Sequence, residues 1–147
     1  MESSNNAPET EQTKCVEYSS TQIDTSNAAV TDNGYLSATG VNPSLPGFSP
    51  ANLAKHWGSG TSSDHSGQYP EFTKEQYAQR ALTLVRSATD DNVLGYKAAD
   101  GAIIRYDKNA NDFVKGFITG IATLYKPNDG ENYFNRLMER EGGKQCD

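Results

Sequence analysis

Two histidines, His56 and His65, are the side chains of this 147-residue chain best suited to proton transfer near neutral pH. His56 follows Lys55 at the expected C-terminal end of a helix, where the helix dipole favours a protonated imidazole. His65 lies nine residues later, in a loop rich in Ser and Gly. Each also has an ordinary interpretation, since His56 could pack beside Trp57 and His65 could be solvated.

Hydrogen-bond donors for an anion lie in the apolar stretch Gly101–Pro127, on segments whose pattern predicts strands. Arg105 could bind a phosphate, and Thr123 and Tyr125 could donate hydrogen bonds to it. Strand alternation places Thr123 and Tyr125 on one face together with Ile121. A face that carries Arg, Thr and Tyr suits the floor of an anion site, although these residues are also ordinary strand composition. Lysines that could contact phosphates as well, or could simply be solvated, are Lys55, Lys97 and Lys126.

Cleavage of RNA by its own 2′-hydroxyl is a reaction that needs no more than these residue types. It requires a base for the 2′-OH proton, an acid for the departing 5′-oxygen and donors around a charged phosphate. The sequence contains no phosphate-binding Gly loop, no His/Cys metal cluster and no serine nucleophile motif. We therefore predict neither a metal nor a cofactor, and a metal-dependent DNA nuclease is disfavoured.

The elements that must position the histidines are two helices and the loop between them. Ser49–Pro50 fits the cap and first position of a helix that would end where the loop Gly58–Gln68 begins. This loop carries His65 and contains little that predicts a rigid structure. Thr73–Gln76 is a capping box that opens the second helix.

Two β-hairpins are expected after the helices, and an Asp-Gly turn signal marks the first. In the second, apolar residues within Phe113–Leu124 would also fit one helix face, but Gly116, Gly120 and the β-branched residues make a poor helix. Helices followed by such a sheet predict an α+β fold, with N-terminal helices packed on a small twisted antiparallel sheet. The predicted strands are Val93–Lys97, Ala102–Asp107, Asp112–Phe117 and Ile121–Lys126, with a last helix capped by Asp129.

Most of the acidic charge lies in the first third of the chain. The net charge is −6 and the pI is near 4.9, which excludes a generic polyanion binder. Residues 1–45 hold one lysine and six carboxylates, a net −5, which leaves −1 on residues 46–147. The front segment is expected to be flexible or held by the rest, and the Pro-rich stretch Val41–Pro50 marks a boundary. We thus predict a polar N-terminal segment over 1–45 and the folded domain over 46–147.

The cysteines and the start of the chain bear on where the protein works. Cys15 and Cys146 are either incidental thiols or a bridge that would need an oxidising compartment, and their spacing does not decide. No run is long and apolar enough to cross a bilayer, and the start MESSNNAPET lacks the parts of a signal peptide. If the chain is exported, we expect something else to carry it.

Four stretches together resemble a family of bacterial toxins. They are LAKHW, YPEFTKEQYAQRA, DGAIIRYDKNANDF and GIATLYKP, in this order between about Leu53 and Tyr133. The chain resembles the C-terminal toxin domains of contact-dependent growth inhibition proteins and, more widely, polymorphic toxins of the barnase, EndoU, colicin D and RelE ribonuclease group. The resemblance implies a metal-independent ribonuclease, usually a tRNase, exported as part of a large cell-surface protein and active in the cytoplasm of a neighbouring cell.

The same resemblance implies partners and a division of the chain. The partners are tRNA, a cognate immunity protein and, for some members, translation elongation factor Tu, which presents the tRNA. Residues 46–147 would be the nuclease domain. Residues 1–45 would be similar to the region by which such toxins reach the cytoplasm, or to its remnant.

These expectations assign a role to each candidate side chain. His56 is predicted as the general base or acid and His65 as a second proton carrier, while Arg105 stabilises the phosphate. Thr123 and Tyr125 orient the phosphate or the leaving oxygen. The alternative is a non-catalytic protein-interaction domain, which the acidity and the small number of histidines favour.

Overall fold

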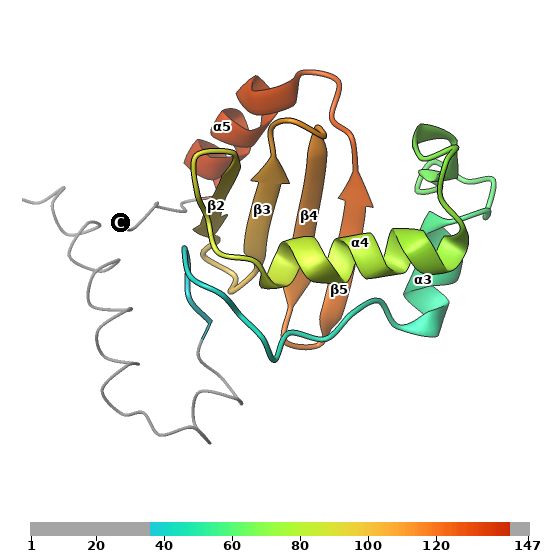
Figure 1. Ribbon diagram of the computed structural model, residues 1–147, viewed down its shortest axis with the longest axis horizontal. Coiled ribbons are helices and arrows are strands. Elements are labelled where there is room, and N and C mark those ends of the chain that lie inside the picture. Colours follow the sequence, from blue (N-terminus) through green and yellow to red (C-terminus); the bar gives the residue numbers. More distant parts are fainter. Residues whose placement is uncertain (1–35, 142–147) are drawn as a thin grey trace, which may run out of the picture.

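Four antiparallel strands form the centre of the protein, with helices packed around them (Figure 1). The computed structural model describes residues 36–141. Their elements are α3 (Pro50–His56), the 3₁₀ turn η1 (Ser66–Gln68), α4 (Lys74–Arg86), β2 (Val93–Lys97), β3 (Ile103–Asp107), β4 (Asp112–Phe117), β5 (Gly120–Tyr125) and α5 (Gly130–Arg140). The strands pair in chain order, β2-β3-β4-β5, so each neighbouring pair is a hairpin. The predicted α+β fold is confirmed.

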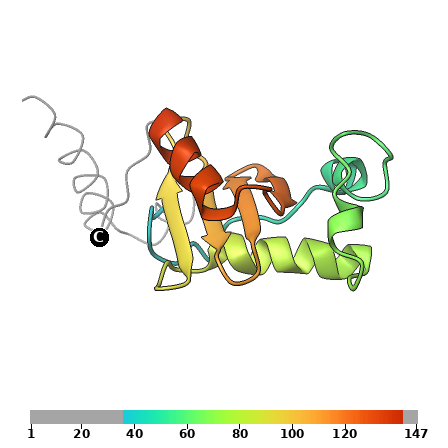
Figure 2. The ribbon, with the colours of Figure 1, turned by 90° about the horizontal axis from the view of Figure 1, so that it is seen from above.

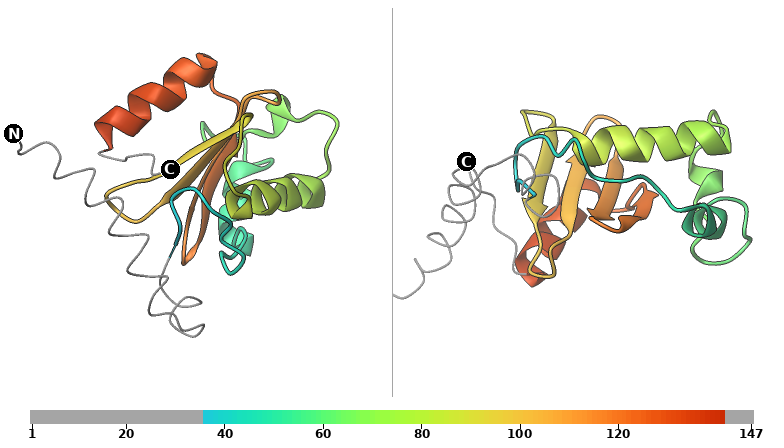
Figure 3. Two further views of the ribbon diagram at one scale, coloured as in Figure 1. Left: turned by 60° about the vertical axis from the view of Figure 1, so that its left-hand side comes forward. Right: turned by 90° about the horizontal axis from the view of Figure 1, so that it is seen from below.

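Helices α4 and α5 lie on opposite faces of the sheet, and α3 lies beside the edge strand β5 (Figures 2 and 3). We call the two sides of the sheet the α4 face and the α5 face. Leu84 and Val85 of α4 belong to one buried cluster, and Phe134 and Leu137 of α5 belong to the other. Because successive strand residues point to opposite faces, each strand contributes to both clusters. On the α4 face these are Val93, Ile103, Val114, Ile121 and Leu124, and on the α5 face Tyr96, Ile104, Tyr106 and Phe113, with the partly buried Tyr125 of β5 packed against them.

The helices that precede the sheet begin at the caps predicted from the sequence. The Ser49 hydroxyl accepts a hydrogen bond from the Asn52 N–H at the start of α3. At the start of α4, the Thr73 hydroxyl accepts from the Gln76 N–H and the Gln76 side chain accepts from the Thr73 N–H, which completes the capping box. Asp129 does precede α5, but its carboxylate pairs with an arginine of that helix and makes no cap bond.

Strands β4 and β5 form the second hairpin, so the strand prediction is confirmed here and the helical alternative is wrong. A β-bulge interrupts their register. Lys115 pairs with Thr123, whereas the next residue, Gly116, pairs with Ile121. Ala122 is therefore an extra residue in β5, and it shifts the alternation of the side chains by one.

The bulge decides which residues of β5 share a face. Ile121 and Leu124 are both buried in the α4 cluster. Tyr125 contacts Phe113 on the α5 face, with ring centroids 5.3 Å apart, and Thr123 lies on the same face two residues earlier. The prediction that Ile121 shares a face with Thr123 and Tyr125 is thus wrong, because regular alternation does not continue through a bulge.

Residues 36–45 belong to the packed fold rather than to a flexible segment. The Asn42 N–H donates to the Arg86 carbonyl, and the Thr89 N–H donates to the Thr39 carbonyl. The front segment predicted over 1–45 is therefore held by the rest of the chain from residue 36 onward, and the folded part begins before the predicted boundary. The buried side chains of this stretch are Leu36, Ala38, Asn42 and Leu45.

Cys15 and Cys146 lie outside the described residues, so the two interpretations of these thiols stay open. Within residues 36–141, none of the helices has the length and apolar character needed to span a bilayer.

Candidate active site beside strand β5

His56, His65 and Tyr125 come together at the end of β5. The ring centroids of the two histidines are 5.7 Å apart, and those of His65 and Tyr125 are 5.1 Å apart. The His65 N–H donates to the His56 carbonyl over 2.9 Å, which fixes the loop to the end of α3. The Tyr125 hydroxyl is hydrogen-bonded to the hydroxyl of Tyr133 on α5. We call His56, His65, Tyr125 and Tyr133 the histidine site.

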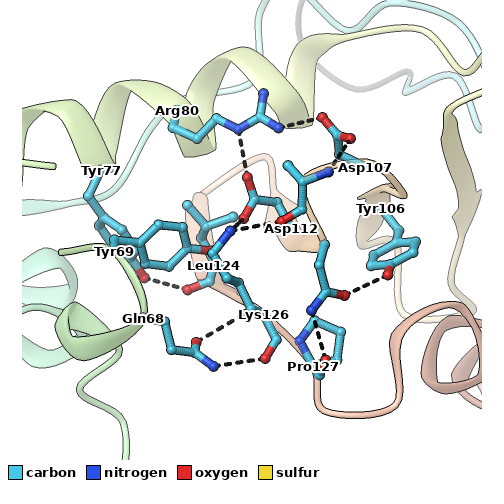
Figure 4. A network of polar contacts seen from close by, with 12 residues as sticks. Gln68, Tyr69, Tyr77, Arg80, Tyr106, Asp107, Asp112, Leu124, Lys126 and Pro127 are labelled. Atoms are coloured by element: carbon cyan, nitrogen blue, oxygen red, sulfur yellow. Dashed lines mark hydrogen bonds and ion pairs between the residues drawn. The ribbon is translucent and has the colours of Figure 1, made fainter. Parts of the chain in front are cut away.

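Two amide side chains attach the histidine-bearing segments to β5. The Asn52 amide of α3 donates to the carbonyl groups of Ile121 and Ala122, over 2.7 Å and 3.1 Å. Two consecutive carbonyls can face the same side chain only because the bulge breaks their alternation. The Gln68 amide of η1 donates to the Lys126 carbonyl over 2.8 Å and accepts from its N–H over 3.0 Å (Figure 4). Both segments are thus bonded to the sheet edge by side chains.

The His56 imidazole is nearly buried, with 7% of the residue's surface exposed. Its Nδ1 lies 3.0 Å from the Asn52 carbonyl oxygen, which can only accept. Nδ1 therefore carries a hydrogen. A neutral His56 has its lone pair on Nε2, and a protonated His56 carries its second proton there.

The His65 imidazole is half-buried beside His56 and Tyr125. Burial lowers its pKa below the ordinary value, and the neighbouring His56 lowers it further, while the Asp64 carboxylate acts in the opposite direction. A depressed pKa means that His65 is mostly neutral at pH 7 and can accept a proton.

The loop that carries His65 is held by the Asp64 carboxylate, contrary to the expectation that it has little rigid structure. One carboxylate oxygen accepts from the Gly58 N–H over 2.9 Å, and from the N–H and hydroxyl of Ser66 over 3.0 Å and 2.7 Å. The other accepts from the Gly60 N–H over 2.8 Å. An Asp surrounded by Gly and Ser is a recognised turn-forming signal, and it could have indicated this order.

Arg105, predicted to stabilise a phosphate, lies outside the histidine site. It is fully buried on the α4 face, opposite to Tyr125. Burial lowers its pKa to about 10, so it stays charged at neutral pH. The guanidinium has no access to a substrate, and its role is to bind the main chain. It donates to the carbonyl groups of Ser37, Ala38, Gly40, Ser87 and Ile104 at 2.8 to 3.5 Å.

Gly95 makes room for the buried Arg105 on the neighbouring strand. A Cβ at this position would lie 2.9 Å from both the Arg105 Cδ and the Ile104 carbonyl oxygen, and closer still to the guanidinium. Gly95→Ala is therefore expected to lower the free energy of unfolding by about 1–3 kcal/mol through overpacking. Urea denaturation would measure the loss. The matched change Gly67→Ala, where no atom lies within 4 Å of the added Cβ, is expected to have little effect on the unfolding free energy. Equal stability of the two variants would contradict the steric role of Gly95.

Lys126, a predicted phosphate contact, is part of a charge network on the α4 face (Figure 4). Its Nζ lies 2.9 Å from Asp112 Oδ1 and 4.7 Å from the centre of the Tyr69 ring. Asp112 also accepts from the Tyr69 hydroxyl and from Arg80, which binds Asp107 as well. Two carboxylates are thus matched by two cations, and this network joins α4 to the ends of the strands.

The other two candidate lysines lie in different places. Lys97 is on β2, at the opposite edge of the sheet, where its Nζ donates to the Leu36 carbonyl over 3.3 Å. Burial lowers the pKa of Lys97 to about 8. Lys55 is exposed on α3, next to His56. Lys55 precedes His56 in the chain, whereas Lys126, which follows Tyr125, turns its Nζ to Asp112.

Lys115 and Tyr133 are candidate site residues that the sequence analysis did not propose. Lys115 pairs with Thr123 across the β4–β5 hairpin, so both side chains lie on the α5 face, near Tyr125. Its Nζ is 3.7 Å from a carboxylate oxygen of Glu141, and about a quarter of the side chain is exposed. Strand alternation from Phe113 could have identified Lys115, whereas only the fold brings Tyr133 to Tyr125.

No protein-family model matches this chain, and no curated protein matches it. Among residues 36–141, no group of His, Cys, Asp and Glu side chains is arranged to hold a metal ion.

Proposed function

We propose that this protein is an endoribonuclease toxin that cleaves RNA, with tRNA as its substrate, without using a metal ion. The observation that carries the proposal is the pair of imidazoles 5.7 Å apart, one of which contacts the Tyr125 ring. Transphosphorylation by the 2′-OH needs two groups that transfer protons on either side of one phosphate. Two adjacent histidines can supply both.

The environments of the two histidines suggest how the proton transfers are divided. Neutral His65 takes the proton of the 2′-OH, whose oxygen attacks phosphorus and forms a 2′,3′-cyclic phosphate. The bond from phosphorus to the 5′-oxygen breaks, and protonated His56 gives its Nε2 proton to that oxygen. Tyr125 and Tyr133 share one hydrogen bond, so one of their two hydroxyl hydrogens is left to donate to the phosphate.

Charge for the phosphate would come from lysines rather than from Arg105. Lys55 is exposed on α3 and precedes His56 in the chain, and Lys115 lies opposite Thr123 on the α5 face. The net charge of −6 disfavours strong unaided binding of RNA. This fits a toxin to which elongation factor Tu presents the tRNA. The motif resemblance supports delivery into neighbouring bacteria and neutralisation by an immunity protein.

Incubation of the purified protein with total RNA tests the proposal. We expect tRNA fragments that end in a 2′,3′-cyclic phosphate, equal rates with and without EDTA, and faster cleavage when elongation factor Tu is present. The His56→Ala variant is expected to lose nearly all of this activity. Ser62→Ala is the matched control, because Ser62 is exposed in the same loop and makes no side-chain hydrogen bond within residues 36–141. Inhibition by EDTA would contradict the metal-free mechanism, and no cleavage in any mixture would favour a protein-interaction domain.

A further inference from the structure

Asp64 directly precedes His65, and both of its carboxylate oxygens accept hydrogen bonds within the 58–66 loop. We infer that Asp64 is a positioning residue of the histidine site: its carboxylate folds this loop and so holds the His65 imidazole between His56 and Tyr125. The inference rests on the proposed function, because it assigns Asp64 a role in that same site.

The loop requires a carboxylate rather than any polar side chain of this size. Gly58 and Ser66 donate to one oxygen and Gly60 donates to the other. An asparagine would place its NH₂ group against an N–H donor whichever way it is turned. Gly58 and Gly60 have φ angles of 84° and 75°, in the left-handed region that glycine adopts without steric cost. With these backbone conformations, the N–H groups of Gly58 and Gly60 both point toward the Asp64 carboxylate.

The placement of His65 follows from the main chain on either side of it. Its N–H donates to the His56 carbonyl. Ser66, the next residue, begins η1, whose Gln68 is bonded to the edge of the sheet. If the bonds to Asp64 are lost, the segment before His65 is released while Gln68 stays attached. The main chain at His65 would then be held by its N–H bond to the His56 carbonyl and by Gln68, without the bonds that fold residues 58–64.

Removal of the Asp64 carboxylate could release the His65 ring or could only remove a negative charge beside it. The pKa of His65 distinguishes these two effects. The pKa of Asp64 lies far below its usual range, because the N–H groups of Gly58, Ser66 and Gly60 bind the ionised form. Asp64 therefore stays charged throughout the pH range in which histidines titrate, and this charge raises the pKa of His65. Burial, which has the largest effect, and His56 on α3 both lower the pKa of His65.

A further titratable neighbour of His65 is Tyr125, whose ring lies against the imidazole. Burial and the bond to Tyr133 raise the pKa of Tyr125, which keeps the phenol neutral in this range. If removal of the Asp64 carboxylate releases the loop, His65 loses its burial and its pKa rises toward the ordinary value. If the loop stays in place and only the charge is lost, the pKa of His65 falls.

An NMR titration of the imidazole signals in the full chain distinguishes these outcomes. The chain has only two histidines, so the His56→Ala variant assigns both signals. In Asp64→Asn we expect the pKa of His65 to rise and the cleavage of tRNA at pH 7 to fall by about 10- to 100-fold, as a displaced catalytic group would cause. Ser62→Ala is expected to change neither quantity.

A fall in the pKa of His65, or no change, would overturn the inference. If Asp64→Asn does not fold, Ser66→Ala decides instead, because it removes one donor to the carboxylate and leaves the backbone donors in place. That variant is expected to raise the His65 pKa by a smaller amount, and no rise would again overturn the inference. The two proposals can fail separately. If the His65 pKa rises in Asp64→Asn but the wild-type protein cleaves no RNA, only the proposed function is contradicted. If the wild-type protein cleaves RNA but the His65 pKa does not rise in Asp64→Asn, only the role of Asp64 is contradicted.

Discussion

Alanine in place of His65 is expected to lower the rate of RNA cleavage by about 10²- to 10⁴-fold, the usual contribution of a group that transfers protons. The physical reason is that His65 combines a depressed pKa with partial exposure beside Tyr125. Initial rates on tRNA measure the effect, and the thermal midpoint should change little because the side chain is only half-buried. Cleavage at the wild-type rate would remove His65 from the mechanism.

The pH dependence of the wild-type rate provides an independent check of the same assignment. His65 acts as a base only in its neutral form, and burial holds its pKa below the ordinary value. The rate should therefore fall as the pH drops through this lowered pKa. In His65→Ala that acidic limb should disappear from the residual activity.

A double variant tests whether the two histidines act as one unit. If both transfer protons in the same step, His56→Ala combined with His65→Ala should be hardly slower than either single variant. Because His56 is nearly buried and bonded to Asn52, its replacement should also lower stability, unlike that of His65. Multiplicative losses of rate in the double variant would contradict a shared step.

Replacement of Arg105 by alanine is expected to lower the free energy of unfolding by about 3–5 kcal/mol, the largest stability effect we expect in this protein. The guanidinium is fully buried and donates to five backbone carbonyl groups. Its removal leaves buried acceptors without donors and creates a cavity. Urea denaturation with a linear extrapolation would measure the loss.

Arg136→Ala is the matched control for Arg105→Ala. Arg136 pairs with Asp129 at 2.6 Å, but more than half of each side chain is exposed. We expect a loss of no more than about 1 kcal/mol, because surface ion pairs contribute little. If Arg105→Ala instead unfolds like the wild type and fails to cleave RNA, Arg105 is a phosphate ligand after all, as its sequence context predicts.

The parts of the fold that the sequence predicted depend on signals that are local in the chain. The Thr73 capping box and the Ser49 cap each involve side chains and N–H groups within three residues. The hairpins formed by the Gly-rich, β-branched segments are also local, because each pairs two strands that are consecutive in the chain. Such contacts can be inferred from residues that are close together in the sequence, and the structure confirms the helices and hairpins that they define.

The errors in the predicted site have a different origin. The acceptors of Arg105 are carbonyl groups of distant residues, and side-chain identities do not show where a carbonyl points. The extra residue at Ala122 has no local signature either, since it exists only relative to the register of β4. Residue type alone predicts that His56 and His65 act together. The geometry came from bonds to Asp64 and Asn52, whose importance the sequence did not reveal.

The attachment of α3 and η1 to the end of the sheet also determines when the site can exist. The bonds that hold them span 69 residues from Asn52 to Ile121 and 58 residues from Gln68 to Lys126. Contacts of such separation form late and are lost together when a small domain unfolds. A chain that is still being synthesised, or that is threaded unfolded through a membrane, therefore carries both histidines without an assembled site. For the proposed nuclease this is a form of latency, in which RNA cleavage can begin only after β5 has joined the sheet.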